Sequence, residues 1–491
     1  MVWAEETQES CRTKARNFLT IASLGIPLLI FAMGVSCSSI QSHYVQVDQA
    51  LAKGKPEVAD ALVEKHKDEY GKENQVLYAM DRGMLLHLSG RYQESTMFFE
   101  RAEHMIKDLY TRRISSEAVA LLINDNILPY EGEHFEQVLI HVIMALNYTY
   151  QGLFDDALVE ARKIDHILNV LSDRAENTYA YTQDAFARYL TGLLFESRGE
   201  LEDAFVAYRL AYEAFQLHHA VYGTSIPSLL GEDLLRLSVA LNLEEEFEKY
   251  QQDFPDATWQ SPDEVQEFGE LVVISFHGRA PKKTGEFIDL PFSMRALGMI
   301  FATRDLKSSK NGRVAQNILY GLTGNVFSVA LPKFDSQPSK VNHTEISLIG
   351  GGKTKTVRTV LMEDVTEIAK QDLDDRLVWE SSRAVARAAL KFALVKAAER
   401  EVAQATDKKD LGRLVGFIAT LAGSITEQVD IRSWRTLPDE IQLARVRVQP
   451  GTYELHVRHV GRNGKVLDEK AFPSVEIAIG ELKVLSHRTV L

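Results

Sequence analysis

The chain has 491 residues, of which 45% are hydrophobic and 25% are charged, and its formal net charge is −14 at pH 7. That length suits roughly two to four domains, and the acidic balance argues against a nucleic-acid partner, which would need a basic face. Both cysteines, Cys11 and Cys37, precede residue 38. The sequence after them therefore excludes disulfides, thiolate zinc sites, iron–sulfur clusters and cysteine nucleophiles.

The N-terminal segment has the layout of an export signal. Basic residues precede an uncharged, mostly apolar run at 18–36, as in secretory signal peptides. The run ends in small residues before Cys37 and resembles the lipobox of bacterial lipoproteins, with Gly34 standing where leucine is usual. We predict that 1–36 is a signal peptide and that 37–43 is a tether carrying a palmitate-type lipid on Cys37.

Two other interpretations of this segment stay open. The run at 18–36 is long enough to cross a bilayer as an uncleaved anchor, although Gly25 and Pro27 weaken a helix there. In the other interpretation, Cys37 is an ordinary cysteine beyond a conventional cleavage site. All three place the body outside the cytoplasm, and we expect a lipid-anchored outer-membrane protein that faces the periplasm.

Seven small or aromatic positions recur three times in the first half of the chain, at the spacing of a tetratricopeptide repeat (TPR) helical hairpin. A small residue in the first helix allows close approach of the second, a glycine supplies the turn, and aromatic side chains fill the remaining space. Such hairpins stack into a solenoid with a concave binding surface. We predict a TPR-like helical domain at 44–255, with a weaker first hairpin at 44–70 and a capping hairpin at 229–250. The three clear repeats are Gly83, Leu86, Gly90, Tyr92, Ser95, Phe99 and Ala102; Ala145, Tyr148, Gly152, Phe154, Ala157, Ala161 and Ile164; and Gly192, Phe195, Gly199, Leu201, Ala204, Tyr208 and Ala211.

Tyrosines are the candidate ligand contacts of the solenoid. Tyr148, Tyr181 and Tyr189 are predicted to face a peptide in the groove, because tyrosine is enriched in binding hot spots. Packing between helices is the competing interpretation, since these repeats use aromatic residues in their cores. His218 and His219 have no acidic or cysteine partner at ligand spacing, so we expect no metal there.

After a proline-containing linker at 251–268, the pattern changes to strands within a mixed α/β domain at 268–440. The segment 347–354 ends like a phosphate-binding loop, but Ser347 stands where that motif needs its first glycine. Residues of high β-propensity follow, so a glycine-rich hairpin is the better interpretation. Strands are predicted at 271–276, 326–331 and 344–349.

Two helices are predicted farther along. Within 377–402, Arg383 and Arg387 stand one helical turn apart and begin a cationic ridge. The segment 411–425 is apolar and rich in glycine. We expect it to be a helix buried against the sheet, and a hairpin that touches a membrane is the alternative.

The stretch from Asp430 to Pro438 is the most specific sequence of the second half. It resembles the Asp-x-Arg-Ser-Trp-x-x-Leu-Pro signature of a family of uncharacterised bacterial lipoproteins with TPR-like repeats and a β-rich tail. The turn from Gly278 to Pro281 and the basic helix are also similar, and the resemblance covers most of 37–491. It implies an architecture and a location rather than an activity.

Asp430, Arg432 and Trp434, with the ridge at Arg383 and Arg387, form the candidate ligand-binding or structural cluster. One interpretation is a buried, salt-bridged knot that joins the helices to the last sheet, with Trp434 covering the ion pair. The alternative is an anion or glycan site, in which the arginines bind charge and the tryptophan stacks on a sugar.

The tail at 441–491 alternates apolar and polar residues between turn sequences, and predicts a small antiparallel β-sandwich-like module. His456 and His459 stand three apart on one strand, hence on opposite faces, so they cannot share a metal ion. The whole sequence thus predicts an α+β multidomain protein without metal or cofactor: an N-terminal TPR-like solenoid, a mixed α/β region and a C-terminal β module.

These features favour a scaffold or adaptor that binds a protein or peptide partner in cell-envelope assembly. The alternative is a periplasmic hydrolase or transferase with its site in 268–491. The sequence has no Gly-x-Ser-x-Gly elbow and no His-Glu-x-x-His pair, so no catalytic residue is assigned. Two carboxylates converging in a cleft would favour the enzyme.

Overall fold

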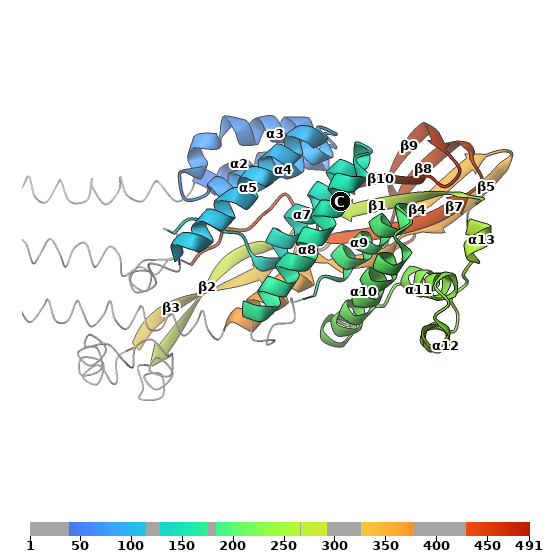
Figure 1. Cartoon of the computed structure of the whole chain (residues 1–491). Coiled ribbons are helices and arrows are strands. Elements are labelled where there is room, and N and C mark those ends of the chain that lie inside the picture. Colours follow the sequence, from blue (N-terminus) through green and yellow to red (C-terminus); the bar gives the residue numbers. More distant parts are fainter. Residues whose placement is uncertain (1–38, 114–127, 175–182, 266, 292–325, 378–428) are drawn as a thin grey trace, which may run out of the picture.

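A computed structural model describes six parts of the chain, which combine helices with sheets and so confirm the predicted α+β class (Figure 1). No helix within these parts is long and apolar enough to cross a membrane. The described residues are 39–113, 128–174, 183–265, 267–291, 326–377 and 429–491.

The first half is built from helices that pair with their neighbours along the sequence: α2 with α3, α4 with α5, α7 with α8, α9 with α10, and α11 with α12. The helices are α2 (Ser39–Ala52), α3 (Pro56–Lys65), the 3-10 helix η1 (Lys67–Tyr70), α4 (Gln75–Leu88), α5 (Tyr92–Arg113), α7 (His134–Tyr150), α8 (Phe154–Arg174), α9 (Ala185–Ser197), α10 (Leu201–Tyr222), α11 (Ser228–Ala240), α12 (Glu244–Asp253) and α13 (Pro262–Val265).

Glycine holds two of these pairs close together, as the repeat pattern predicts. A Cβ added to Gly83 in α4 would lie 2.6 Å from the ring of Phe99 in α5, and one added to Gly192 in α9 would lie 2.6 Å from the ring of Tyr208 in α10. Both distances are far below van der Waals contact, so the aromatic rings occupy space that any larger residue would need. The turn glycines of the three repeats have φ values of 73°, 73° and 76°, which glycine adopts without strain: Gly90, Gly152 and Gly199.

Within the described residues, the strands form two four-stranded sheets and one two-stranded ribbon. The first sheet has the order β10-β1-β7-β6 and the second the order β5-β4-β8-β9, while β2 pairs with β3. β1 and β10 are parallel, and the other pairs are antiparallel. The strands are β1 (Gly269–His277), β2 (Lys282–Pro291), β3 (Val326–Asp335), β4 (Val341–Gly350), β5 (Lys353–Arg358), β6 (Val360–Asp364), β7 (Glu440–Val448), β8 (Gly451–Gly461), β9 (Val466–Ile477) and β10 (Leu482–Thr489).

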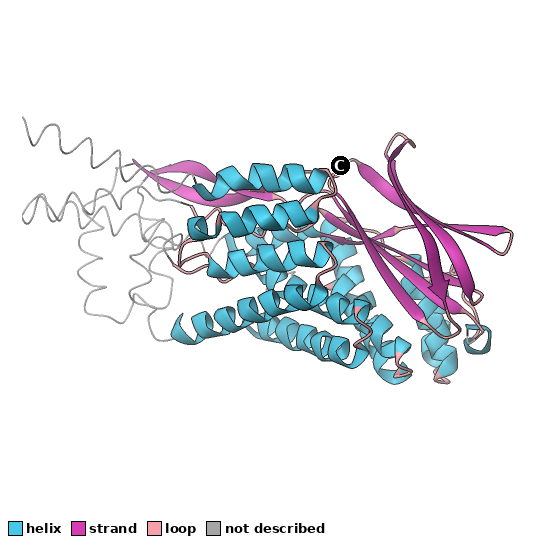
Figure 2. Ribbon diagram, turned by 90° about the horizontal axis from the view of Figure 1, so that it is seen from above, coloured by secondary structure: helices cyan, strands magenta, loops and turns pink. Residues whose placement is uncertain are grey.

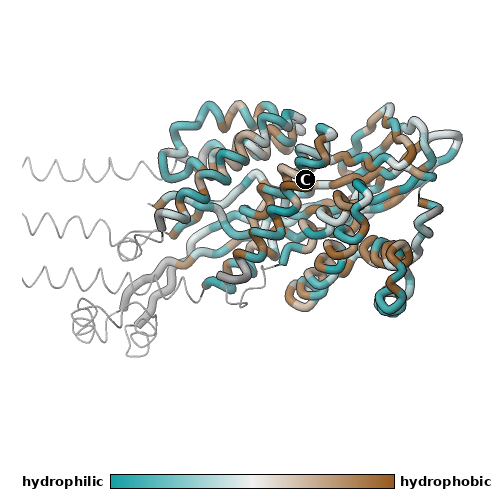
Figure 3. Tube along the Cα trace, viewed as in Figure 1, coloured by the Kyte–Doolittle hydropathy of each residue, from teal (hydrophilic) through white to brown (hydrophobic). Residues whose placement is uncertain are grey.

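The first sheet lies between the helices and the second sheet (Figure 2). Alternate residues of β1 divide between its two sides: Leu271 and Val273 pack toward the second sheet, whereas Val272 and Ile274 pack in the core shared with the helices. Hydrophobic stretches accordingly run along the strands at the centre of the molecule, and the turns are hydrophilic (Figure 3).

The tail at 441–491 is not a separate module, so the predicted boundary at residue 440 is wrong. β7 and β10 both pair with β1, and β8 pairs with β4. Alternating hydrophobicity shows that a segment is a strand and which side is buried, but it does not show which distant strand is its neighbour.

Several local predictions are confirmed. The strands predicted at 271–276, 326–331 and 344–349 lie within β1, β3 and β4. β4 and β5 form a hairpin whose turn residues, Gly351 and Gly352, have φ values of 58° and 74°. This segment is therefore a glycine hairpin and not a phosphate-binding loop.

The predicted tether at 37–43 is wrong for most of its length. α2 begins at Ser39, and His43 is buried against the first hairpin, because an amphipathic pattern already starts there. Other predicted features lie outside the described residues: Cys11, Cys37, Tyr181, Arg383, Arg387 and the segments 378–402 and 411–425.

Candidate functional site

The helical array has two faces that differ in their surroundings. The inner face is formed by α4, α7, α9 and α11 on the side toward the first sheet and residues 429–439. The outer face is formed by α5, α8 and α10 on the opposite side. All residues from Val76 to His87 in α4 and from Ala185 to Phe195 in α9 are buried. Helices that are buried all round have packing partners on both sides. The inner face is therefore covered by the second half of the chain, residues 267–291, 326–377 and 429–491, which we call the β region.

The signature segment Asp430–Pro438 fills part of this inner face. The ring of Trp434 meets Phe99 of α5 edge-on, with centroids 5.6 Å apart. Its backbone N–H donates to Glu136 Oε1 in α7 at 2.7 Å, and its indole N–H donates to Thr436 Oγ1 at 2.8 Å. With 1% of its surface exposed, Trp434 is a core residue and cannot stack on a sugar.

Asp430 and Arg432 pair with each other, as one of the sequence interpretations holds. Arg432 Nε donates to Asp430 Oδ1 at 2.8 Å, and Arg432 Nη1 donates to Asn74 Oδ1 at 3.1 Å. The guanidinium lies 5.2 Å from the ring centroid of Tyr130. Tyr130, and not Trp434, covers the ion pair, so the predicted role of the tryptophan is wrong. The described part of the cluster forms a structural knot between helices and sheet.

Asp81 of α4 is a second anchor for the segment. Its carboxylate accepts hydrogen bonds from Thr436 Oγ1 at 3.0 Å, Tyr44 Oη at 2.6 Å and Tyr70 Oη at 2.8 Å. Burial raises the pKa of Asp81 to about 6, because the three hydroxyls and the charge of Arg435 offset only part of the loss of water. These three hydroxyls join the first hairpin, α4 and the signature segment into one unit.

Two glutamates at the start of α7 bind the β region in different ways. Glu133 is the N-terminal cap of α7 and pairs with Lys283 of β2 and with Arg376. Burial alone would raise its pKa, but these two cations hold the pKa well below its ordinary value. Glu136 is buried next to it, and burial followed by repulsion from Glu133 raises the pKa of Glu136 to about 7.

Arg445 of β7 connects the first sheet to the far end of the inner face. Its guanidinium contacts Asp233 of α11 at 2.6 Å, Glu270 of β1 at 2.6 Å and Glu196 of α9 at 3.2 Å. Tyr189 Oη donates to the same Asp233 at 2.9 Å and the tyrosine is fully buried. Tyr189 therefore belongs to this network, and the prediction that it contacts a peptide is wrong.

Tyr148 stands at the end of α7 and is half-buried against the helical core. The acids near enough to affect its hydroxyl are Glu100 of α5 and Asp156 and Glu160 of α8, so it lies near the second helices of the pairs. Of the three tyrosines, the structure thus assigns Tyr189 to packing, and the peptide contact of Tyr148 stays a prediction. The peptide groove expected from the repeats is filled by the protein's own chain.

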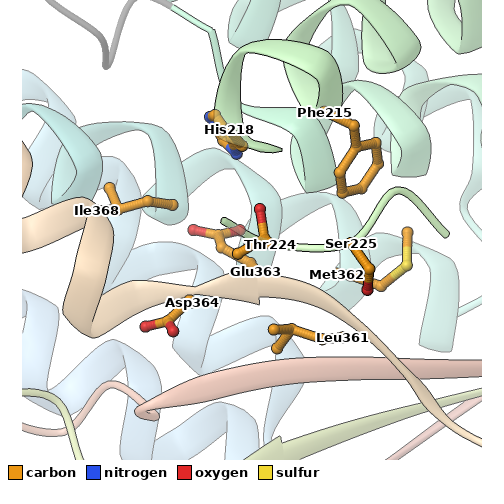
Figure 4. A pocket seen from close by; sticks show the side chains of 9 residues that line it. All are labelled: Phe215, His218, Thr224, Ser225, Leu361, Met362, Glu363, Asp364 and Ile368. Carbon is orange, nitrogen blue, oxygen red and sulfur yellow. The ribbon is translucent and has the colours of Figure 1, made fainter. Parts of the chain in front are cut away.

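Carboxylates gather at one small cavity between α10, the α10–α11 connection and β6 (Figure 4). Glu363 points into the side where His218 and Thr224 lie, and Asp364 points away from it. Neither carboxyl oxygen of Glu363 has a hydrogen-bond partner within the described ranges. Burial, then Asp184 and Asp364, raise the pKa of Glu363 well above 4.5. The cavity measures about 10 Å³, which is room for about one water molecule and not for a substrate.

Sequence patterns alone do not identify the acids that hold the β region. Asp81, Glu136 and Asp233 lie in the middle or first turn of helices whose other residues are buried. A carboxylate among consecutive apolar residues is unusual unless it is paired. That contrast is the signal that could have marked the inner face as an intramolecular interface.

No protein-family model matches the chain, and no curated protein matches it. Solved structures that resemble it include MamA from Desulfovibrio magneticus RS-1, with 14% identity and a TM-score of 0.28 over 45% of this chain and 93% of that one. BtubC from P. vanneervenii has 15% identity and a TM-score of 0.31 over 51% and 90% of the two chains.

A third similar structure is NprR in complex with its cognate peptide NprX, with 14% identity and a TM-score of 0.18 over 51% of this chain and 78% of that one. Likenesses of this strength carry no argument about fold or function. The description of the helical pairs therefore rests on the contacts within this chain.

Proposed function

We propose that this protein is a non-enzymatic scaffold of the bacterial cell envelope. In this proposal a lipid on Cys37 anchors it to the membrane and its body faces the periplasm. We also propose that it belongs to the lipoprotein family that carries the Asp-x-Arg-Ser-Trp-x-x-Leu-Pro signature. The scaffold binds a protein partner through the outer face of its helical array. The observation that carries this proposal is an exposed apolar position that recurs in three successive pairs.

Met97, Val159 and Val206 each stand five residues after the first residue of their helix, in α5, α8 and α10. Their exposed fractions are 62%, 48% and 43%. Single exposed apolar residues are common on protein surfaces, but the same position in three neighbouring units makes an ordered set. Lys163 of α8 contacts Glu103 of α5 at 3.4 Å, so the second helices of the first two of these pairs lie next to each other.

Acidic residues accompany this set in the first turn of the same helices. They are Glu94 in α5, Asp155 and Asp156 in α8, and Glu202 and Asp203 in α10, and all five are exposed. The partner that fits is a protein segment with apolar side chains flanked by lysine or arginine. The covered inner face supports the same choice, because a peptide there would have to displace buried Trp434.

Site-specific photo-crosslinking tests whether the outer face binds a partner. A photoreactive residue at Met97, Val159 or Val206 should capture the same partner in intact cells. The matched control is a photoreactive residue at Ile479 in the β region, which is 64% exposed. Absence of a common product at the three outer positions, or an equal product at position 479, would count against the proposal.

The lipid anchor has its own test. α2 begins two residues after Cys37, so an acylated Cys37 would hold the first hairpin directly at the membrane surface. Cys37→Ser should release the protein from the outer-membrane fraction into the soluble periplasmic fraction. A variant that remained in the membrane would instead support an uncleaved anchor at 18–36.

The enzyme alternative gains no support from the cavity at Glu363. Its size admits about one water molecule, and its two neighbouring acids point to opposite sides of β6.

A further inference from the structure

The space between the two four-stranded sheets changes character along the strands. The residues of β1 that point toward the second sheet are Leu271, Val273, Ser275 and His277 in order, and those of β8 run from Leu455 and Val457 to His459. One end of the space is therefore an ordinary aliphatic core. The other end is a buried layer of histidine and hydroxyl side chains, which is unfavourable unless these groups have partners.

Hydrogen bonds connect most of this layer. Thr344 Oγ1 of β4 lies 2.9 Å from His459 Nδ1 and 2.9 Å from His277 Nε2, and Ser275 Oγ lies 2.7 Å from the same His277 atom. When His459 carries its proton on Nδ1, it donates to Thr344, and the lone pair of its Nε2 points away from the network. A metal ion at Nε2 would select this tautomer.

Three imidazole nitrogens in the layer have no hydrogen-bond partner among the described residues: His277 Nδ1, His459 Nε2 and His487 Nε2. The rings of His459 and His487 are stacked, with centroids 5.0 Å apart and an interplanar angle of 19°. His459 itself is fully buried. A buried nitrogen without a hydrogen-bond partner destabilises the folded protein, so these atoms call for a ligand.

A carboxylate completes the set. Asp468 of β9 stands directly opposite His459 in the β8–β9 register. One atom each from Asp468, His459 and His487 lie within 4.8 Å of one another. Asp468 is exposed, His487 is half-buried and His459 is buried, so this corner of the space between the sheets is open to solvent on one side.

We propose that His459, His487 and Asp468 bind a divalent transition-metal ion of the Zn²⁺ class. Two imidazole nitrogens and one carboxylate oxygen are ligands that Zn²⁺ accepts, and three protein ligands leave a coordination position for water on the exposed side. Metal–ligand bonds of about 2.1 Å place tetrahedral ligand atoms about 3.4 Å apart, so binding draws the three side chains together. Imidazole ligands disfavour Mg²⁺ and Ca²⁺.

The charges around the three ligands are compatible with this ion. Burial and the neighbouring His487 lower the pKa of His459 to about 4, and burial lowers the pKa of His487. Lys470, two residues from Asp468 along β9, is the cation that also lowers the pKa of His487 and opposes the metal. Thr344 holds His459 from behind, as the outer-shell partners of metal ligands do.

A second histidine cluster, His43, His66 and Glu69, has the same geometric potential but different contacts. Its ligand atoms contact one another or their neighbours: His66 Nδ1 lies 2.7 Å from Glu69 Oε1, and His43 Nε2 lies 3.2 Å from Tyr70 Oη. His43 Nδ1 and Glu69 Oε2 have no hydrogen-bond partner among the described residues, but they lie 3.5 Å from each other. It is therefore the weaker candidate for metal binding. A variant of this cluster serves as a control for the number of Zn²⁺ ions bound.

The test is Zn²⁺ titration of the full-length protein after removal of metals with a chelator. Calorimetry should show one Zn²⁺ site in the wild type that is absent from His459→Ala/His487→Ala. The matched control is His456→Ala, because His456 lies on the same strand but on the opposite face, bound to Glu454 and Glu469. This control, and His66→Ala in the second cluster, should retain the site.

Two measurements separate ligation from folding. Co²⁺ bound to the wild type should give visible d–d absorption, which His487→Gln, a change at a partly exposed edge strand, should abolish. Thr344→Val should weaken Zn²⁺ binding by about 10- to 100-fold while the protein remains folded. Zn²⁺ should also raise the Tm of the wild type and not that of His487→Gln.

The proposal is overturned if the double variant binds Zn²⁺ with unchanged stoichiometry and affinity, or if His456→Ala loses the site equally. If the double variant does not fold, the Co²⁺ spectrum of His487→Gln decides: an unchanged spectrum overturns the site. None of these results depends on the scaffold proposal, which concerns a different face of the molecule.

Discussion

The inner and outer faces of the helical array belong to the same repeats, but the inner face is covered by the β region and the outer face is exposed. On the inner face, Asp81, Glu136 and Asp233 receive hydrogen bonds or ion pairs from the β region. On the outer face, the helices expose Met97, Val159 and Val206. The comparison shows that an array of helical pairs can have one side covered by the rest of its own chain. Here that side is part of the protein's own core.

The difference has a simple physical basis. The first helices of the pairs carry apolar residues on both sides and bury acids that need donors, so they are stable only when the sheet covers them. The second helices are apolar on one side only, and their polar side is hydrated by solvent. The predictions below test this division, starting with the largest expected effect.

Removing the anchor of the signature segment should affect stability most. Trp434→Ala deletes a ring that is 1% exposed and packs on Phe99. Loss of its buried surface and the resulting cavity should lower the free energy of unfolding by about 3–5 kcal/mol. Urea denaturation measures this change. Ile431→Ala, at a position that is 39% exposed, is the control and should change stability by less than about 1 kcal/mol.

Removing one member of the buried ion network should be nearly as harmful. Arg445→Ala removes the cation that Asp233, Glu270 and Glu196 share. Arg236 still pairs with Asp233 and Glu196, and Arg447 still pairs with Glu270, so the cost should lie at the lower end of the range of about 3–5 kcal/mol that is typical of a broken buried ion pair. Arg358→Ala, in an ion pair whose arginine side chain is 68% exposed, should change stability by at most about 1 kcal/mol. Equal effects in the two variants would mean that the inner face is not a desolvated interface.

Overfilling a helical pair should have an intermediate effect. In Gly192→Ala the new methyl group meets the ring of Tyr208, so the helices must separate at a cost of about 1–3 kcal/mol. Gly83→Ala should behave alike because of Phe99. In the middle pair the same position is already Ala145, and Ala145→Gly should cost only about 1 kcal/mol of helix propensity. Thermal unfolding would rank the three variants.

The buried carboxyl at Glu363 should make stability depend on pH. The pKa of Glu363 in the folded protein lies above its ordinary value of 4.5. At a pH between the ordinary pKa and the folded pKa, the folded protein keeps a proton that the unfolded chain releases. Stability therefore falls as pH rises through this window, by up to about 1.4 kcal/mol per pH unit. Glu363→Gln should remove that slope. Parallel stability–pH profiles for the two proteins would contradict a protonated Glu363.

The smallest effect is expected on the outer face. Serine at Met97, Val159 and Val206 together should change the free energy of unfolding by only about 0.5 kcal/mol per site, because these side chains are already exposed. The same variant should lose capture of the partner. A large loss of stability would mean that the outer positions are structural and would remove the basis of the comparison.

Local structure follows closely from the sequence. The pairing of small and aromatic residues predicts the helical pairs, and Gly83 and Gly192 contact the rings expected of them. Alternation predicts β1, β3 and β4, and the turn at Gly351 follows from its glycines. These features depend on residues near one another in the chain, so a short window contains the cause.

The candidate sites are less predictable from the sequence than the local structure is. The ion pair of Asp430 and Arg432 is local and was predictable, but the burial of Trp434 and Tyr189 depends on residues hundreds of positions away. His277 and His487 carried no signal of their own, and only the alternation Leu271, Val273, Ser275, His277 hints that a histidine points inward.

The amino-acid sequence by itself determined which segments are helices and strands and which side of each is apolar, because those properties are set by side-chain periodicity. Only the tertiary structure decided that the inner face is closed and that three metal-ligating side chains from β8, β9 and β10 meet. Both outcomes require long-range strand pairing, such as β1 beside β10. Many pairings bury the same surface, and the packing of the whole molecule selects one of them.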